Sequence, residues 1–549
     1  MPNAAAYGSW KSPITSDLVA QSITLSEARF DGEDVYWLEG RPQELGRLVV
    51  VRANALDGHA ADVTPKPYNA RTRAHEYGGA SWTVVNGDIY FSNFADGRLY
   101  RQVNNSSHPV PLTPAPAVPE RQWRFADGVI DRVRQRWIGV REDHTGDGEP
   151  INTIVAVDLH EPGRDAGRVL VGGHDFFAAP RLSPDGRWLI WLTWDHPNMP
   201  WNGATLRLSE LDGAGNITEP LTVAGSASES VFQPEWSPDS KAIFFVSDRS
   251  GWWNLYHFDL ASRTSEPLAP MAAEFGAPLW KLGATTYACA GSDRIVCSYS
   301  KAGLGQLALL ELKGKVLRPF ETPFTDFSSV RANGHRAVFR AGASNHPASI
   351  VILDLISGEH QVLKKETDLL DQPESRIADH LSTVRPVEFP TTDGNTAYGL
   401  FYPPHNPDYV APRDELSPLL VKCHGGPTAS ASSVLDLTTQ FWTSRGIAVL
   451  DVNYGGSTGF GRAYRNRLHL NGASLMLMIV SMVPNSSLQR GWSITIASSS
   501  EVAVLAATPH WRRWCFGISF RVEQVIMELV TSPRWRAKPT NLSHAISNG

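Results

Sequence analysis

Two glycine-rich turns hold the residues of this sequence whose types and spacing could do chemistry. In the first, His424, Gly425 and Gly426 form an HGGP sequence with Pro427, directly after the apolar residues 418–423. Adjacent glycines allow backbone N–H groups to face a ligand, as an oxyanion hole requires. The alternative is a plain tight turn. We take His424, Gly425 and Gly426 as candidate oxyanion-region residues, which would stabilise the negative oxygen formed when a carbonyl is attacked.

The second turn contains Ser457 within a G-x-S-x-G pattern that follows the apolar residues 446–452. A serine in this pattern is typical of a nucleophile elbow, provided that an acid and a histidine follow along the chain. No Asp follows Asp451. The later carboxylates and histidines are Glu501, Glu523, Glu528, His469, His510 and His544. Because these belong to no recognisable motif, we interpret Ser457 as part of a structural turn and predict no catalytic residue in the chain as written.

Both turns follow strands that must lie in one sheet. Residues 418–423 and 446–452 are nearly continuous apolar runs, and a helix is expected between them at residues 433–444. Such strands alternating with helices are typical of a parallel sheet that is buried on both faces. A predicted hairpin at residues 384–402 precedes them. Open α/β sheets place their ligand chemistry at the carboxyl ends of the strands, where both turns begin.

A repeat organises the first two-thirds of the chain. Five short strands end in an acidic residue and Leu, at residues 153–159, 205–211, 254–260, 306–312 and 349–355. Their spacing of roughly 43 to 52 residues is the length of one four-stranded propeller blade. Two earlier units, at residues 29–51 and 77–100, fit this plan more loosely. We expect a β-propeller of about seven blades over residues 29–370, with an array of β-sandwiches as the alternative.

Composition excludes several classes of function. A chain of 549 residues is expected to form at least two domains. The net charge of −6 with scattered Lys and Arg predicts no nucleic-acid partner and no membrane association. The start of the sequence does not resemble a secretory signal, so we expect a cytoplasmic protein. The cysteines, which show no zinc-like spacing and are expected to be reduced, are Cys289, Cys297, Cys423 and Cys515. No metal or other cofactor is expected, and the oligomeric state is not indicated.

A propeller followed by HGGP and by residues 453–461, NYGGSTGFG, resembles the prolyl oligopeptidase family of serine peptidases. The similarity is to its dipeptidyl-peptidase and acylaminoacyl-peptidase-like branch, which residues 7–15, YGSWKSPIT, also resemble. The resemblance covers residues 1–471. It implies an α/β-hydrolase domain with a Ser-Asp-His triad, covered by a propeller that restricts access to short peptides. It also places His424, Gly425 and Gly426 around the oxyanion.

The sequence changes character after Asn471. Residues 472–549 contain no Asp and no Tyr, and the family's elbow, G-G-S-x-G-G, is absent. If one T is missing directly after the codon of Asn471, the codons from residue 472 onward can encode W-G-V-V-D-V-D-D-C-V-N-G-A. The codons of residues 500–508 can then encode R-G-G-S-A-G-G-Y, which contains the missing elbow. We therefore expect residues 472–549 to be an out-of-frame, non-native tail.

The expected organisation is an N-terminal segment (1–28), a propeller (29–370), the N-terminal part of an α/β-hydrolase domain (380–471) and the tail (472–549). By family, the protein would hydrolyse short peptides through an acyl-enzyme. The chain as written would be inactive, because nucleophile, acid and base are missing. Two alternatives stay open, a non-catalytic propeller that binds a partner and a carboxylesterase-like hydrolase that uses Ser457. Peptide specificity is not readable from the sequence.

Overall fold

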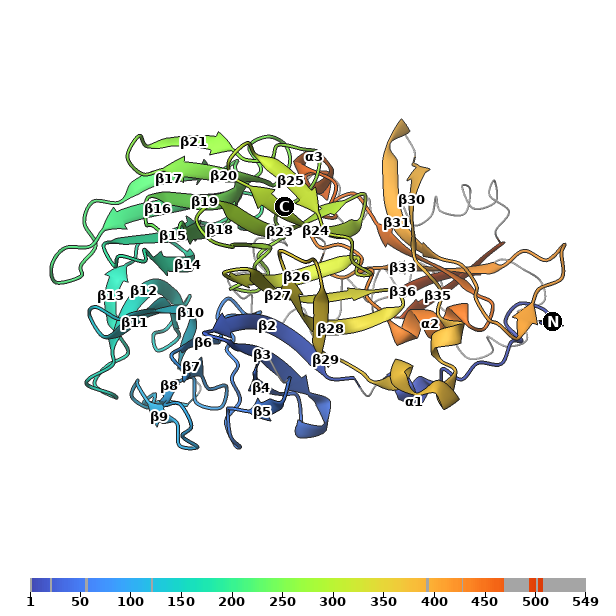
Figure 1. Cartoon of the computed structure of the whole chain (residues 1–549), viewed down its shortest axis with the longest axis horizontal. Coiled ribbons are helices and arrows are strands. Elements are labelled where there is room, and N and C mark those ends of the chain that lie inside the picture. Colours follow the sequence, from blue (N-terminus) through green and yellow to red (C-terminus); the bar gives the residue numbers. More distant parts are fainter. Residues whose placement is uncertain are drawn as a thin grey trace.

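The computed structural model of the chain describes residues 2–19, 22–54, 58–119, 122–391, 394–426, 428–468, 493–499 and 502–506. Figure 1 shows a ring of small sheets on one side and a second sheet with short helices on the other. The change after Asn471 that the sequence suggests lies outside the described residues. Of the tail, only two strands are described.

Seven four-stranded sheets, counted among the described residues, form the ring, and neighbouring strands in each sheet are antiparallel. The first three sheets are β2 (Thr24–Asp31), β3 (Asp34–Arg41), β4 (Arg47–Asn54), β5 (Ala60–Asp62); β6 (Trp82–Val85), β7 (Asp88–Ser92), β8 (Leu99–Gln102), β9 (Val110–Pro111); and β10 (Trp123–Asp131), β11 (Arg136–Asp143), β12 (Ile151–Asp158), β13 (Arg168–Val171). β2 contacts β26 and β27 of the last sheet. The sheets therefore close into a β-propeller, as predicted.

The remaining sheets complete the propeller. They are β14 (Phe176–Leu182), β15 (Trp188–Trp194), β16 (Ala204–Glu210), β17 (Leu221–Ser226); β18 (Val231–Trp236), β19 (Ala242–Ser247), β20 (Asn254–Asp259), β21 (Thr264–Pro267); β22 (Tyr287–Cys289), β23 (Arg294–Lys301), β24 (Leu304–Glu311), β25 (Val316–Pro319); and β26 (Asp326–Asn333), β27 (Arg336–Ala343), β28 (His346–Asp354), β29 (His360–Lys365). The five repeated strands of the sequence are β12, β16, β20, β24 and β28, the third strand of each sheet.

Ion pairs connect the first strands of different sheets. Arg181 of β14 contacts Asp127 of β10 at 2.9 Å (Nη1 to Oδ1) and Glu235 of β18 at 3.8 Å (Nε to Oε1). Arg331 of β26 contacts the same oxygen of Glu235 at 3.1 Å. A β-bulge in β10 turns Asp127 to φ 53°, and its Oδ2 accepts a hydrogen bond from the backbone N–H of Ala179 in β14. The bulges and charges thus join strands that share no ladder.

The second sheet has the strand order β30-β31-β34-β33-β35-β36. Its strands are β30 (Arg385–Pro390), β31 (Thr396–Tyr402), β33 (Pro418–Cys423), β34 (Ala448–Asn453), β35 (Ser493–Ser499) and β36 (Val502–Ala506). β30 and β31 form the predicted hairpin, and β33 and β34 are parallel, with Val421 opposite Leu450. β35 joins β33 in parallel at Pro418 and Leu419. The apolar residues of β33 and β34 are buried, as their sequence indicates.

The helix expected at residues 433–444 is shorter in the structure. α2 (Leu437–Thr443) begins after Asp436, whose side chain accepts hydrogen bonds from the backbone N–H groups of Thr438 and Thr439. This is a regular N-cap. The hydroxyl of Ser433 instead contacts the propeller, donating to the carbonyl of Thr325 at 3.0 Å. Contact with the propeller therefore takes residue 433 out of the helix.

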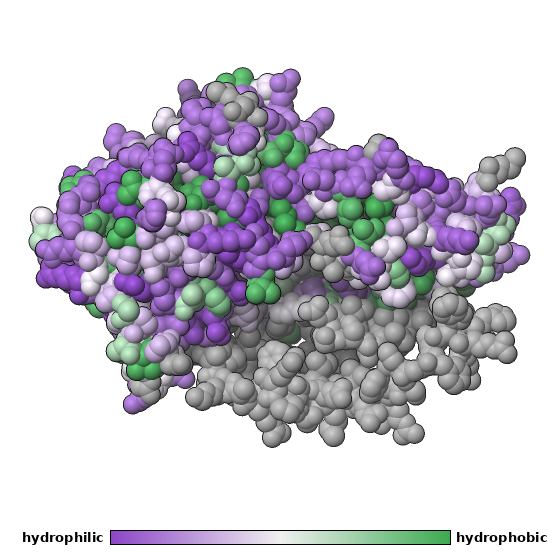
Figure 2. Space-filling view, turned by 90° about the horizontal axis from the view of Figure 1, so that it is seen from below, coloured by the Kyte–Doolittle hydropathy of each residue, from purple (hydrophilic) through white to green (hydrophobic). Residues whose placement is uncertain are grey.

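The N-terminal segment packs on the second sheet's side of the molecule. β1 (Asn3–Ala4) pairs in parallel with β32 (Tyr409–Val410), and the backbone N–H of Gly8 donates to the carbonyl of Arg445. The remaining short elements are α1 (Ser16–Val19), α3 (Arg462–Arg465), η1 (Pro42–Glu44), η2 (Leu369–Asp371), η3 (Pro373–Ser375) and η4 (Ala378–His380). The coloured part of the face in Figure 2 is mainly hydrophilic, with scattered hydrophobic residues. No described helix is long and apolar enough to cross a membrane.

Candidate active site

The structure brings the two glycine-rich turns of the sequence together. His424 follows β33 and Ser457 follows β34, which lies beside β33 in the sheet. His424 Nε2 lies 2.8 Å from Ser457 Oγ. The ring of Tyr454 stacks on the His424 imidazole with 4.5 Å between centroids, and its hydroxyl donates to the His424 carbonyl at 3.2 Å. Parallel pairing of the strands thus places both sequence candidates at one edge of the sheet.

His424 is a neutral histidine with an assignable tautomer. Burial lowers its pKa to about 4, although a hydrogen bond to the Gly425 carbonyl acts in the opposite direction. That carbonyl lies 3.2 Å from Nδ1, and because a carbonyl oxygen only accepts, Nδ1 carries the proton. Nε2 then accepts the hydrogen bond from the Ser457 hydroxyl. No carboxylate orients this ring among the described residues, since its Nδ1 is used by a backbone carbonyl.

Ser457 is held inside the turn. Its exposed fraction is 0%, and its backbone N–H donates to the Tyr454 carbonyl at 2.9 Å. The next residue, Thr458, donates its backbone N–H to the Ala429 carbonyl, near the first turn. The His424–Ser457 hydrogen bond therefore joins two turns around a buried hydroxyl. A nucleophile needs an open approach for its substrate, and this geometry supports the interpretation of Ser457 as a structural residue.

Gly425 and Gly426 occupy the exposed part of the first turn. Gly426 has φ +57°, a left-handed conformation that glycine adopts without strain. Among the described residues, no hydrogen bond uses the backbone N–H of Gly425 or Gly426. Exposed N–H groups at the carboxyl end of a buried parallel strand have the character that an oxyanion hole requires.

A tryptophan from the propeller supports this turn. Trp280 Nε1 donates to the Thr428 carbonyl at 2.7 Å, and a Cβ placed on Gly426 would lie 3.6 Å from the Trp280 ring. The rings of Tyr77 and Trp201 contact Trp280, with centroids 5.1 and 4.4 Å away. Sequence reasoning missed Trp280, because it lies in a connection between blades and 148 residues separate it from Thr428.

A buried group of four charges joins the segment after the second turn to the propeller. Asp248 accepts hydrogen bonds from both Arg462 and Arg465 of α3. Glu274 accepts from the backbone N–H of Gly461 at 3.0 Å, and Arg465 Nη1 lies 4.0 Å from its Oε1. Burial lowers the pKa of Arg465 and raises that of Glu274, while the opposite charges act against both changes. The turn that holds Ser457 is thereby fixed to the blades.

A second group of charges lies on β33, on β34 and at the start of α2, with Asp451 buried and Lys422 and Asp436 half-buried. Lys422 Nζ contacts Asp436 Oδ2 at 3.1 Å and Asp451 Oδ2 at 3.4 Å. Burial raises the pKa of Asp451 to about 6 from an ordinary 3.8, although Lys422 acts to lower it. Lys422 is on β33, Asp451 on β34, and Asp436 caps α2. These charges link the helix to the two strands that carry the candidate site.

Replacing Asp451 by asparagine should remove a pH dependence of stability. Between about pH 4 and pH 6 the Asp451 carboxyl keeps its proton in the folded protein but loses it in the unfolded chain. The free energy of unfolding therefore decreases as the pH rises through this interval. Over this interval we expect the free energy of unfolding of the Asp451→Asn chain to rise by up to about 3 kcal/mol relative to that of the parent. Urea unfolding at several pH values measures the difference. Asp165→Asn, the same change at an exposed loop residue, is the control, and parallel curves for parent and Asp451→Asn would contradict the prediction.

That the protein needs no metal or other cofactor stays a prediction of the sequence. Among the described residues, no three His, Cys, Asp or Glu side chains lie close enough together to hold a metal ion. Within the same part of the chain, the cysteines Cys289, Cys297 and Cys423 are free thiols. The fourth, Cys515, lies outside the described residues.

Comparisons with known proteins place the chain in a family. The structure is similar to a puromycin-hydrolyzing peptidase of Mycobacterium tuberculosis, with a TM-score of 0.82 and 36% identity over 89% of this chain and 75% of that one. A puromycin hydrolase gives a TM-score of 0.82 at 35% identity, with the same two shares. The chain therefore belongs to the prolyl oligopeptidase family of serine peptidases, as its sequence indicates.

A curated relative agrees with this assignment. Dipeptidyl aminopeptidase BIII of Pseudoxanthomonas mexicana is 37% identical over 83 residues, which make up 15% of this chain. The match spans 12% of the length of that protein. No family model matches the chain.

Proposed function

We propose that this protein is, by descent, a peptidase that hydrolyses short peptides through an acyl-enzyme on a serine. The observation that carries the proposal is the exposed Gly425–Gly426 turn at the end of β33, whose backbone N–H groups suit an oxyanion. Family membership supplies the substrate class. The relatives, a dipeptidyl aminopeptidase and a puromycin-hydrolyzing peptidase, support cleavage close to a peptide N-terminus, of dipeptidyl or acylaminoacyl type.

The second part of the proposal concerns the chain as written. We interpret residues 29–370 as the propeller domain and residues 380–471 as the N-terminal part of an α/β-hydrolase domain. Residues 472–549 would be out of frame, so that nucleophile, acid and base are missing and the chain is inactive. Support comes from the absence of Asp after Asp451 and of the elbow pattern. A cytoplasmic location stays a prediction of the sequence.

Resequencing the gene across the codon of Asn471 tests this directly. An extra T, followed by an open frame through a G-G-S-A-G-G elbow to an Asp and a His, would identify the sequence as an altered copy of a peptidase gene. If the base is absent, residues 472–549 follow Asn471 in the natural protein, and the proposed loss of activity applies to that protein. An extra T without such a continuation would contradict the frameshift.

A second candidate function is ester hydrolysis by Ser457, favoured by its 2.8 Å contact with His424 Nε2. The buried hydroxyl argues against it, and so does the lack of a described carboxylate bonded to the His424 ring. We expect Ser457→Ala to leave the rate of any p-nitrophenyl acetate hydrolysis by the chain unchanged within about twofold. Removal of a true nucleophile would instead lower the rate by orders of magnitude. Steady-state rates of the two purified proteins provide the measurement. A loss of the rate with retained circular dichroism would establish Ser457 as the nucleophile.

A further inference from the structure

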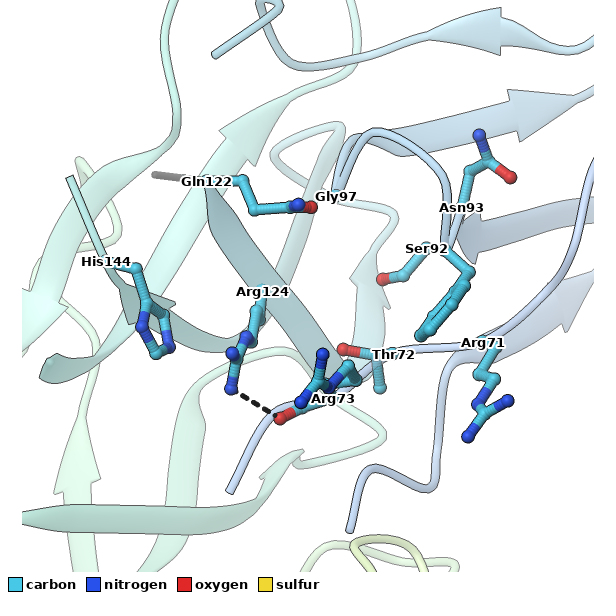
Figure 3. Close-up of a pocket in the computed structure, with 10 residues that line it drawn as sticks. Arg71, Thr72, Arg73, Ser92, Asn93, Gly97, Gln122, Arg124 and His144 are labelled. Atoms are coloured by element: carbon cyan, nitrogen blue, oxygen red, sulfur yellow. Dashed lines mark hydrogen bonds between the residues drawn. The ribbon is translucent and has the colours of Figure 1, made fainter. Parts of the chain in front are cut away.

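The propeller contains a cavity whose lining is dominated by arginines. Its volume is about 310 Å³, at the lower end for small-molecule sites. Figure 3 shows Arg124 between His144 and Arg73, with Arg71 beyond Thr72. The lining comes from residues before β6, from the end of β7 and the turn after it, and from β10 and the residues beside it. The cavity thus lies between the second and third blades and uses no residue of the two glycine-rich turns.

Most neutral side chains at the cavity already form hydrogen bonds with other groups of the protein. Thr72 Oγ1 accepts from the backbone N–H of Ala74, and the Ser92 hydroxyl donates to the Phe125 carbonyl. Asn93 uses both ends of its amide, since Nδ2 donates to Asp96 Oδ1 and Oδ1 accepts from a backbone N–H. The unused hydrogen-bonding capacity of the cavity therefore lies mainly in the arginines, which are donors only.

The three arginines differ in how much of that capacity is free. Arg124 is fixed through Nη1, which contacts Glu76 at 2.8 Å and Glu142 at 2.9 Å, while its Nε and Nη2 make no hydrogen bond among the described residues. Among the described residues, the Arg73 side chain forms an ion pair only with Glu76, at 3.5 Å, and because it is 55% exposed this pair is weak. The Arg71 guanidinium lies over the Phe94 ring at 4.7 Å and forms no ion pair with a described residue.

The charges at the cavity, like its hydrogen-bond donors, favour a negatively charged ligand. The carboxylates of Glu76 and Glu142 offset the charge of Arg124, and Glu142 also binds His144. The charge of Arg71 has no such partner in the described part of the chain. A cavity with excess donors and unbalanced positive charge fits a ligand that only accepts hydrogen bonds and is negative. Guanidinium groups match the planar or tetrahedral oxygens of carboxylate and phosphate.

We propose that this propeller cavity binds a small oxyanion, a carboxylate or a phosphate, through Arg71, Arg73 and the free side of Arg124. The site is independent of the proposed peptidase chemistry, because its residues all belong to the blades. Arg71 and Arg73 contact the anion directly, and Glu76 and Glu142 hold Arg124 in position. The same chemistry could be presented by inorganic phosphate or by the C-terminal carboxylate of a short peptide.

Isothermal titration calorimetry of the 549-residue chain tests the site with three probes: inorganic phosphate, triglycine and triglycine amide. We expect phosphate or triglycine to bind, and the affinity to decrease by about 10- to 100-fold in Arg71→Gln and in Arg73→Gln, as for lost charged hydrogen bonds. Both side chains are exposed, so folding should be unaffected. Arg132→Gln, an exposed arginine in the β10–β11 turn, is the matched control and should bind like the parent.

The three probes distinguish the possible sources of the anion. Triglycine binding without amide binding identifies a peptide terminus as the source of the anion, whereas binding of phosphate alone identifies phosphate. Either result supports the site only if Arg71→Gln and Arg73→Gln weaken it and Arg132→Gln does not. Absence of binding by phosphate and triglycine to the parent chain would overturn the proposal. Unchanged affinity in both pocket variants, with circular dichroism matching the parent, would overturn it as well.

Discussion

Insertion of one T after the codon of Asn471 is expected to turn an inactive protein into a peptidase. The restored frame supplies an elbow serine, encoded across the codons of Ala503 and Val504, in a chain whose first turn already presents Gly425 and Gly426. Loss of a serine or histidine from such a triad costs on the order of 10⁶-fold in kcat. We expect a difference of that order between the repaired and the 549-residue chains, limited by the detection of the lower rate.

Release of p-nitroaniline from dipeptidyl and N-acetyl-aminoacyl p-nitroanilides measures the two rates and also distinguishes the two substrate types. The matched control is a repaired chain whose elbow serine is replaced by alanine, because it restores the domain without the nucleophile. This control should be as inactive as the 549-residue chain. Equal rates for the repaired and the 549-residue chains, or an active control, would contradict a serine acyl-enzyme at this position.

The propeller was predictable because its signals are local and repeated. The third strands of five blades share an alternating pattern and a terminal acid, and each lies where the pattern places it, as β16 shows with Leu206 and Leu208 buried. The turn at residues 183–186 is stabilised locally, because the Ser183 hydroxyl donates a hydrogen bond to Asp185 Oδ1. The first two blades fit the repeat loosely, and their strands β5 and β9 are only three and two residues long.

The candidate site was predictable only in part. His424, Gly425 and Gly426 are recognisable from their own sequence, and parallel strands explain why Ser457 lies beside His424. The propeller residues that support the site are not recognisable, because their partners are far along the chain. Asp248 and Arg465, for example, are separated by 217 residues. The out-of-frame tail stays a prediction, since nearly all of it lies outside the described residues.

Replacing Asp248 by alanine should produce a large loss of stability. Asp248 is fully buried and accepts from both arginines of α3, and its Oδ1 also accepts from the backbone N–H of Ser230 at 2.8 Å. The change would remove the hydrogen-bonded partner of Arg465, whose side chain is 1% exposed, and leave it only the longer 4.0 Å ion pair with Glu274 among the described residues. Removing one partner of a buried charge pair costs about 3–5 kcal/mol, so we expect the free energy of unfolding to decrease by that amount. Urea unfolding followed by tryptophan fluorescence measures it.

Tryptophan fluorescence suits this test because Arg465 lies 4.1 Å above the Trp253 ring. Loss of the ion pair should free the guanidinium and change the emission of that ring before global unfolding. The double variant Asp248→Leu/Arg465→Met should lose less stability than the sum of the two single changes, since it removes both members of the Asp248–Arg465 pair together. Glu161→Ala, in an exposed pair with Arg164, is the control and should change stability by less than about 0.5 kcal/mol. Additive losses in the double variant would show that the buried charges do not act as a pair, and that some other contact fixes α3 to the propeller.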